Sequence, residues 1–348
     1  WLIVAGGVLA VYWIPWAVSA GYLPSGDWGA TPLVAALLAS VAVLAIRHPT
    51  RQLAAVLMMV LAVVWLPSSV RRGDATRSFF GVYRVMTSDD GNYNILIHGT
   101  TLHGAQRIRD ADGHPVSDIS PATYYHSGSP MAQSVVITRE QLDAAGRKGR
   151  YGVVGLGTGS LGCHAAEGEH WRFFEIDPAV IAIASNPQQF SFLFNCQPDP
   201  DIVIGDARLM LAKEADKSFD LIIVDAFSSD AIPVHLMTAE ALKLYMAKLA
   251  DNGVALLHIS NRYLDLEAVL EATTPVVPGL HGIIVSDDVS DGGYAATTST
   301  VALFAKSEAA LEPFRAMDGL IELRPPRLRP WMDDASDILG PFLARLRN

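Results

Sequence analysis

Hydrophobic residues are spread unevenly along the chain, and its beginning differs from the rest. Three long apolar runs, separated by short polar turns, cover residues 1–20, 30–46 and 53–66. A helix that spans a bilayer needs about 20 predominantly apolar residues, within a range of roughly 17–25. The third run reaches that length if Arg51 and Arg71 extend their charged ends to the interface. The pattern predicts a membrane anchor of two or three transmembrane helices over residues 1–67.

Other features of this segment also indicate a bilayer as a partner. Tryptophans, which gather at membrane interfaces, lie near the predicted helix ends at Trp13, Trp16, Trp28 and Trp65. A cleaved signal peptide would explain one apolar run but not three. Because the chain starts at Trp1 rather than at a methionine, there is room for further helices upstream.

Loop charges bear on which side of the membrane the remaining chain lies. Residues 21–29 contain no Lys or Arg, whereas residues 47–52 contain two arginines. The positive-inside rule therefore places the second loop in the cytoplasm, and three spanning helices would leave the following domain outside. Arg71, Arg72 and Arg77 favour the opposite orientation. The charge count slightly favours a non-cytoplasmic domain and leaves both sides open.

Beyond the anchor, the hydrophobic pattern changes to short apolar runs that alternate with helical stretches. Runs of this kind end at Val154, Phe174, Ile204 and Val224. Such alternation predicts an α/β fold with a doubly wound parallel sheet, whose ligands bind at the carboxyl ends of the strands. We expect a linker and a small β-rich domain over residues 68–149 and a Rossmann-like domain over residues 150–348.

Glycines and acidic residues follow these predicted strands. The turn after the first strand contains Gly155, Gly157 and Gly159, and acids stand at or just after the next three strand ends, at Glu175 with Asp177, Asp206 and Asp225. Glycines let backbone N–H groups approach a ligand, and an acid at the end of the second strand lies where ribose hydroxyls would bind. The order of these features predicts a nucleotide or nucleoside pocket.

The residues that are missing narrow the choice of ligand. A kinase or ATPase phosphate loop needs GxxxxGK[ST], and no such lysine follows Gly159 or Gly162. A dinucleotide stays open, because the turn can be read loosely as GxGxxxxG. The three acidic strand ends would repel a diphosphate, but they would tolerate a cationic sulfonium that carries a free ribose and adenine. S-adenosylmethionine or a relative of it fits best.

The chain resembles the spermidine synthase-like family, particularly its membrane-fused bacterial branch, over roughly residues 78–339. The most specific stretch is DAFSSDAIPVHLMT at 225–238, supported by HISNRYLDL at 258–266 and WMDD at 331–334. Residues 79–85, 96–106 and 123–126 look like the small β-domain that precedes the nucleoside domain in this family. The resemblance implies a class I S-adenosylmethionine-dependent (Rossmann-like) fold and a bacterial inner (cytoplasmic) membrane as the location.

The resemblance also implies roles for individual residues. Gly155, Gly157 and Gly159 would border the methionine part of the nucleoside. Glu175, with Asp177 beside it, would bind the ribose, and Asp206 with Ala207 would face the adenine.

Asp225 matches the catalytic aspartate of the family. There, that carboxylate takes a proton from an amine that displaces methylthioadenosine from decarboxylated S-adenosylmethionine. Asp230 and Tyr125 are the next candidates for the same role.

Several positions depart from the family pattern on the acceptor side. Spermidine synthases carry a Tyr-His-Glu element and an acidic pair that hold the cationic polyamine. In this chain the glutamate position is Ser127, and the acidic pair is absent from residues 104–107. Arg107 and Arg109 would repel a diamine, and the short Asp-Ser-Ser-Asp motif is lengthened at 225–230. The resemblance to the family is therefore closer at the positions that would bind the nucleoside than at those that would bind the amine.

Three other features have plain structural interpretations. His98 and His103 lack a neighbouring carboxylate or thiolate cluster in the sequence, so we expect hydrogen-bonded turn residues and propose no metal. Cys163 and Cys196 lack CxxC spacing, and we expect them to pack as small apolar side chains. The acidic stretch 287–293 lacks the ligand spacing of an EF-hand, so we expect a solvated loop.

Composition excludes nucleic acid as the main partner. The 348 residues carry a formal net charge of −10, whereas a phosphate-binding face needs clustered Lys and Arg. Three functions stay open. The first is a membrane-anchored transferase that uses S-adenosylmethionine or its decarboxylated form and a small amine acceptor. The second is a non-catalytic accessory subunit of a larger membrane protein complex, and the third is a methyltransferase.

Overall fold

The structure is a computed structural model that describes residues 74–99, 101–117, 119–227, 233–289 and 292–346. The three apolar runs and the candidate residue Asp230 lie outside these ranges. The described residues belong to one compact unit, Gly73–Asn348. Within them, no helix combines the length and the apolar character that crossing a bilayer requires.

Four antiparallel strands form a small sheet at the start of this unit. They follow one another in the order β1 (Asp74–Arg77), β2 (Val82–Thr87), β3 (Tyr93–His98) and β4 (Thr101–Arg107). A tight turn joins β2 to β3, because Gly91 has a positive φ of 77° and its N–H bonds to the carbonyl oxygen of Ser88 at 2.9 Å. Leu96 in the third strand is fully buried and anchors the small sheet in the core of the unit.

A second sheet of eight strands forms the centre of the unit, in the order β12-β10-β11-β9-β8-β5-β6-β7. Its parallel strands are β5 (Arg150–Val154), β6 (His170–Glu175), β7 (Asp201–Ile204), β8 (Phe219–Val224) and β9 (Leu249–His258). The remaining strands are β10 (His281–Ser286), β11 (Thr300–Ala305) and β12 (Leu320–Glu322).

The prediction of a parallel sheet is confirmed for β5 to β9, while the other three strands join through antiparallel pairings. No helix separates β10 from β11 among the described residues. A direct connection suits antiparallel neighbours, because parallel neighbours need a longer crossover.

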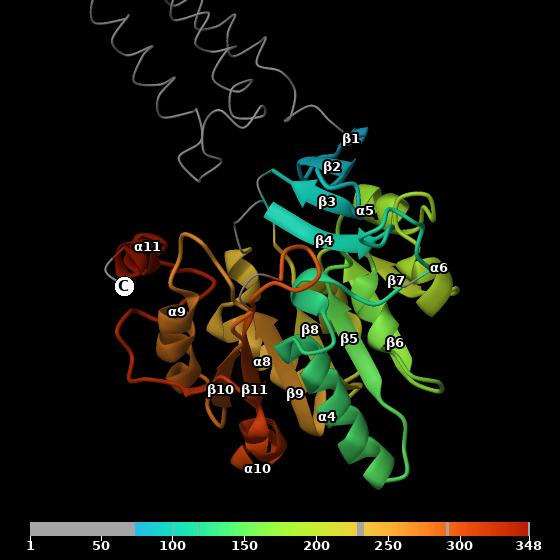
Figure 1. Cartoon of the computed structure of the whole chain (residues 1–348). Coiled ribbons are helices and arrows are strands. Elements are labelled where there is room, and N and C mark those ends of the chain that lie inside the picture. The colour runs from blue at the N-terminus through green and yellow to red at the C-terminus, as the bar shows by residue number, and fades with distance from the viewer. Residues whose placement is uncertain (1–73, 100, 118, 228–232, 290–291, 347–348) are drawn as a thin grey trace, which may run out of the picture. The chain divides into compact units, whose positions relative to one another are not determined.

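Helices cover both faces of the large sheet (Figure 1). They are α4 (Pro130–Ala144), α5 (Pro178–Ala184), α6 (Phe192–Cys196), α7 (Ala207–Lys213), α8 (Ala239–Lys248), α9 (Leu266–Thr273), α10 (Glu308–Leu311) and α11 (Leu339–Arg345). Short 3-10 helices occur at η1 (Thr123–Tyr125), η2 (Ser160–His164), η3 (Val234–Leu236), η4 (Thr274–Val276) and η5 (Glu312–Ala316). Thr238 caps the start of α8, because its side chain accepts a hydrogen bond from the N–H of Ala241.

The central strands are buried on both faces, and β8 has no exposed residue. Leu221 and Ile223 pack in the same core cluster as Val135 of α4, whereas Ile222 packs in the opposite cluster with Leu242 of α8. This division follows from the alternation of side chains along a strand. Each such side chain contributes about 1.5–3 kcal/mol when it is fully buried. The strand ends that carry the glycine turn and the acids are therefore held rigidly.

A disulfide joins Cys163 of η2 to Cys196 at the end of α6, with their Cα atoms 4.9 Å apart. The expectation that the two cysteines pack as separate apolar side chains is wrong. Their sequence separation of 33 residues shows no recognised pairing pattern, and only the packing of α6 against η2 brings them together. The disulfide ties the turn that follows the glycine loop to α6.

Candidate functional site

A cavity of about 290 Å³ lies where the small sheet meets the carboxyl ends of the parallel strands. Figure 1 shows β3 and β4 lying beside this end of the large sheet. Seven of the predicted site residues line the cavity, namely Gly155, Gly157, Glu175, Asp206, Ala207, Asp225 and Tyr125. The small sheet contributes Tyr83, Leu96, His98 and His103. Residues from distant parts of the chain therefore meet in one cavity.

The glycine loop follows β5 in a conformation that side chains rarely adopt. Gly155 has φ of +95°, and a Cβ there would collide with the carbonyl oxygen of Asp225. Gly157 has φ of +54°, and a Cβ would lie 3.0 Å from the carbonyl oxygen of His103. Gly159 does not line the cavity, and its missing side chain leaves room for Leu193 of α6. The first two glycines form the cavity wall, while the third lets α6 pack closely.

Glu175 ends β6 and is held by backbone amides. Its two carboxylate oxygens accept hydrogen bonds from the N–H of Leu156 at 3.0 Å and the N–H of Asp177 at 2.9 Å. Burial raises the pKa of Glu175, although these backbone hydrogen bonds oppose the rise. Each oxygen keeps a second lone pair, so the carboxylate can still accept hydrogen bonds from two ligand hydroxyls.

Asp177 and Asp206 both cap helices, but only Asp206 lines the cavity. Asp177 is buried, accepts the N–H of Ala179 in α5 and binds the hydroxyl of Ser78. The structure therefore places Asp177 between the small sheet and α5, away from the cavity. Asp206 accepts the N–H of Leu209 in α7 at 3.0 Å, and its other oxygen lies 3.1 Å from Nε2 of His235.

Asp225 directly follows β8, and its side chain is only 3% exposed. One carboxylate oxygen accepts a hydrogen bond from the hydroxyl of Tyr125, and the other lies 2.7 Å from Nδ1 of His258. Burial opposes ionisation, but His258, Tyr125 and His103 outweigh it and hold the pKa of Asp225 below its ordinary value. Burial and the nearby Asp225 raise the pKa of Tyr125 far above its ordinary value, so this phenol stays a proton donor.

His258 belongs to this group, although the sequence pattern assigned it no role of its own. It is the last residue of β9, the strand next to β8, and its ring lies 4.9 Å from that of Tyr124 and 5.0 Å from that of Phe227. The position of His258 at the end of a hydrophobic run could have indicated its role, as the same kind of position did for Asp225. A polar residue at the carboxyl end of a buried parallel strand points to the ligand-binding edge of the sheet.

The small sheet supplies another part of the cavity wall. His98 and His103 lie in β3 and β4, with ring centroids 5.6 Å apart, and both line the cavity rather than a turn. Burial lowers the pKa of His98, so this imidazole is neutral at pH 7. The carboxylates of the described cavity lining are Glu175, Asp206 and Asp225.

Arg107 and Arg109 do not act on this cavity, which corrects the expectation that they would repel a diamine there. Their guanidinium groups bond to the carbonyl oxygens of Arg109 and Gly113 in an exposed loop. Gln106, one residue earlier on β4, is buried and exchanges two hydrogen bonds with Ser191, at 2.6 and 2.7 Å. Alternation along the strand explains why adjacent side chains point in opposite directions.

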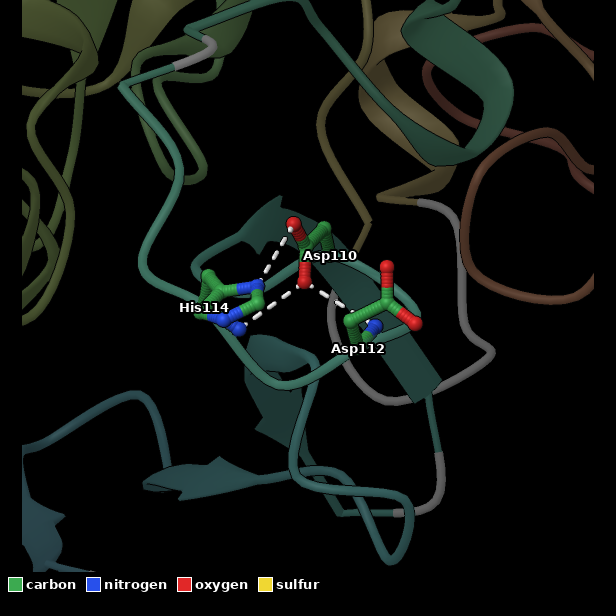
Figure 2. Close-up of side chains that lie close together, drawn as sticks. All are labelled: Asp110, Asp112 and His114. Atoms are coloured by element: carbon green, nitrogen blue, oxygen red, sulfur yellow. Dashed lines mark hydrogen bonds and ion pairs between the residues drawn. The ribbon is translucent and has the colours of Figure 1, made fainter.

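The same loop carries a group of side chains that lies apart from the cavity. Figure 2 shows Asp110 facing His114, with their ion pair at 3.5 Å, and Asp112 beside them. One oxygen of Asp110 already accepts the backbone N–H groups of Asp112 and His114, at 3.0 and 2.8 Å. These bonds stabilise the loop, and we assign the group no ligand.

Known proteins resemble different parts of this chain. No family model matches it. A polyamine aminopropyltransferase from Vibrio vulnificus is 36% identical over 107 residues, which is 29% of this chain and 34% of that protein. An N-terminal histidine N-methyltransferase from Emericella nidulans is 28% identical over 190 residues, which is 53% of this chain and 32% of that protein. The chain therefore spans about a third of the length of the curated relatives that it matches.

A solved structure resembles a larger part of the chain. The probable spermidine synthase of Corynebacterium glutamicum has a TM-score of 0.50 and 12% identity, and the match covers 76% of this chain and 97% of that one. At this identity the likeness concerns the fold alone. The chain has a spermidine synthase-like fold, and one of its sequence relatives is a polyamine aminopropyltransferase.

Proposed function

We propose that this spermidine synthase-like chain is a membrane-anchored transferase that binds S-adenosylmethionine or its decarboxylated form. It would transfer an aminopropyl or related group from the sulfonium to an amine acceptor. One observation carries the proposal, namely that a single cavity unites the glycine loop with Glu175, Asp206 and Asp225. The anchor is proposed from the apolar runs of residues 1–66.

The nucleoside side of the cavity has the shape and charge that such a ligand needs. Gly155 lets the glycine loop pack directly against the backbone of Asp225, so the loop and this acid lie side by side in the cavity wall. Glu175 is held by amides and retains lone pairs for the ribose hydroxyls. Asp206 and Ala207 begin α7 and would face the adenine.

Asp225 has the properties of the proton acceptor in the transfer. A protonated amine has no lone pair, so it must lose a proton as it attacks. A new C–N bond forms while the C–S bond breaks, the sulfonium leaves as a neutral thioether, and the amine proton passes to the Asp225 carboxylate. The low pKa of Asp225 keeps that carboxylate ionised at neutral pH.

The acceptor would carry fewer positive charges than a polyamine. Among the described residues, the carboxylates of the cavity are the three already assigned to the nucleoside and the proton transfer. His98 and His103 also line the cavity, and the part of the lining that the structure describes contains no further anion for a second ammonium group. A monoamine therefore fits this lining better than a diamine.

The product nucleoside tests this proposal and separates it from methyl transfer, which the likeness to an N-methyltransferase favours over part of the chain. The full chain in detergent would be incubated with each nucleoside and a panel of monoamines, diamines and amino acids. We expect methylthioadenosine from the decarboxylated nucleoside, formed about 10² to 10⁴ times more slowly by the Asp225→Asn variant. S-adenosylhomocysteine would instead identify a methyltransferase. Nucleoside binding without either product would overturn the transferase proposal.

The disulfide between Cys163 and Cys196 favours a second candidate, an accessory subunit whose domain lies outside the cytoplasm. Disulfides persist in oxidising compartments and are rare in the cytosol. The arginines of loop 47–52 favour the same side by the positive-inside rule. S-adenosylmethionine is made in the cytosol and would be scarce outside it. In that compartment the fold would serve as a docking body for other subunits.

Protease treatment of sealed, right-side-out cells distinguishes the two candidates. Digestion of the domain beyond Phe79 without membrane inversion would support the accessory subunit. Complete protection, with cleavage only after inversion, would contradict that placement and favour the transferase. Labelling free thiols before and after reduction, in the same cells, reports whether the disulfide is formed there.

A further inference from the structure

We propose that His258 is a positioning residue of this site, which binds the Asp225 carboxylate and holds it in one orientation. In this view Asp225, His258 and Tyr125 work as one hydrogen-bonded unit. The inference rests on the proposed function, in which Asp225 receives the proton of the acceptor. His258 itself does not line the cavity and would act through Asp225.

The contacts of Asp225 fix both of its oxygens. Nδ1 of His258 lies 2.7 Å from one oxygen, and the side chains of His258 and Asp225 are only 6% and 3% exposed. The hydroxyl of Tyr125 donates to the other oxygen. A carboxylate held at both oxygens cannot rotate freely, yet each oxygen keeps a lone pair for a third donor. The remaining lone pairs are therefore presented to the acceptor in a fixed direction.

The imidazole of His258 is itself held in place. The rings of Tyr124 and Phe227 pack against it, and β9 fixes its backbone. Its Nε2 atom is buried and has no hydrogen-bond partner among the described residues. Nδ1 is therefore the nitrogen of His258 that donates a hydrogen bond to Asp225.

The groups around Asp225 come from three elements. They are His103 on β4, Tyr124 and Tyr125 on η1, and His258 on β9. Burial alone would raise the pKa of Asp225, and His258 leads the groups that reverse this effect. Without His258, burial would be opposed more weakly, and the carboxylate would take up a proton closer to neutral pH.

The charge on Asp225 can be measured without knowing the acceptor. S-adenosylmethionine carries a sulfonium cation, whereas S-adenosylhomocysteine has an uncharged sulfur in the same place. The ratio of their affinities for the full chain in detergent therefore reports an anion in the cavity. For the parent protein we expect this ratio to stay constant from about pH 6 to pH 8, because Asp225 stays ionised there.

Three variants separate positioning from folding. His258→Leu removes the donor, and the affinity ratio should fall by at least about tenfold as the pH drops toward 6. His258→Asn keeps an N–H donor near the position of Nδ1, and the ratio should stay within about threefold of the parent. His281→Leu, on the exposed side of β10, is the control that should behave as the parent.

A folded His258→Leu variant with the pH-independent ratio of the parent would overturn the inference. If that variant does not fold, nitrogen-15 histidine spectra of the parent and of Asp225→Asn decide. The Nδ1–H signal of His258 should move when Asp225 is replaced, and an unchanged signal would refute the pair. If the parent binds neither nucleoside, the proposed function fails, while the spectra still test the pair by themselves.

Discussion

The two sides of the cavity are built in different ways. The nucleoside side comes from consecutive strand ends, and Glu175 is held by the N–H of Leu156 in the neighbouring glycine loop, 19 residues away. The acceptor side is assembled over longer distances, because Asp225 binds Tyr125, which lies 100 residues earlier, and His258, which lies 33 residues later. Contacts between consecutive strand ends can be recognised from the sequence pattern. Contacts between residues far apart in the chain depend on how the elements pack.

The difference extends to charge. The nucleoside side presents the carboxylates of Glu175 and Asp206, which suit hydroxyls and a cationic ligand. The small sheet adds His98 and His103 to the cavity lining. Nucleoside binding and acceptor chemistry should therefore respond separately to mutation.

The largest effect is expected on the acceptor side, from Asp225→Asn. The amide keeps the shape but cannot accept the amine proton, so turnover should fall by about 10² to 10⁴. Steady-state assays measure this change, and nucleoside affinity should change far less. Full activity in the Asn variant would show that Asp225 is not the base, and Asp230 would be tested next.

Removing the disulfide should give the next largest effect, on the nucleoside side. A closed loop of this size contributes about 3–4 kcal/mol to the free energy of unfolding in the chain-entropy model. The Cys163→Ser/Cys196→Ser double variant should lose that amount, as measured by urea denaturation. The parent protein treated with an alkylating agent but no reductant serves as the control. Equal stability of the double variant, together with free thiols in the parent, would contradict the disulfide.

Glu175→Ala should have a smaller effect, confined to nucleoside binding. Losing a charged hydrogen-bond acceptor for the ribose should weaken affinity by about 1.5–3 kcal/mol. Glu167→Ala, at an exposed site before the start of β6, is the matched control and should bind as the parent does. Equal affinities in a fluorescence titration of both variants would remove Glu175 from the site.

The pH dependence of binding sharpens this result. Burial raises the pKa of Glu175 in the folded protein, so its carboxylate is protonated at a higher pH than that of an ordinary glutamate. Because the charged form accepts the ribose hydroxyls best, affinity should fall as the pH drops through that raised pKa. Because burial disfavours the charged form, ionised Glu175 lowers the free energy of unfolding at pH values above its pKa in the folded protein. This destabilisation disappears as the pH falls and the carboxyl group takes up a proton. An affinity that is independent of pH between about 4 and 7 would contradict the assignment.

The smallest effect is expected from His235→Ala. His235 pairs with Asp206 at 3.1 Å, but its side chain is 47% exposed. Exposed pairs contribute about 0–1 kcal/mol, so nucleoside affinity should change by no more than that. A loss of turnover as large as that of Asp225→Asn would instead give His235 a catalytic role.

The sequence predicted the nucleoside side well because its features are local. Strands β5 to β8, the glycine turn and the acids at Glu175 and Asp206 follow from hydrophobic runs and the residues that end them. The partnership of His258 with Asp225, the disulfide and the antiparallel strands β10 to β12 depend on tertiary packing. Nothing in the spacing of Cys163 and Cys196 indicates that α6 packs against η2.

Calorimetric titration of the full chain tests the central claim most directly. S-adenosylmethionine, its decarboxylated form and methylthioadenosine would each be titrated into the detergent-solubilised protein, with folding checked by circular dichroism. The account predicts that at least one of them binds with one nucleoside per chain, and that Glu175→Ala weakens that binding while Glu167→Ala does not. If the folded parent protein binds none of the three, the cavity is not a nucleoside site, and the transferase proposal fails with it.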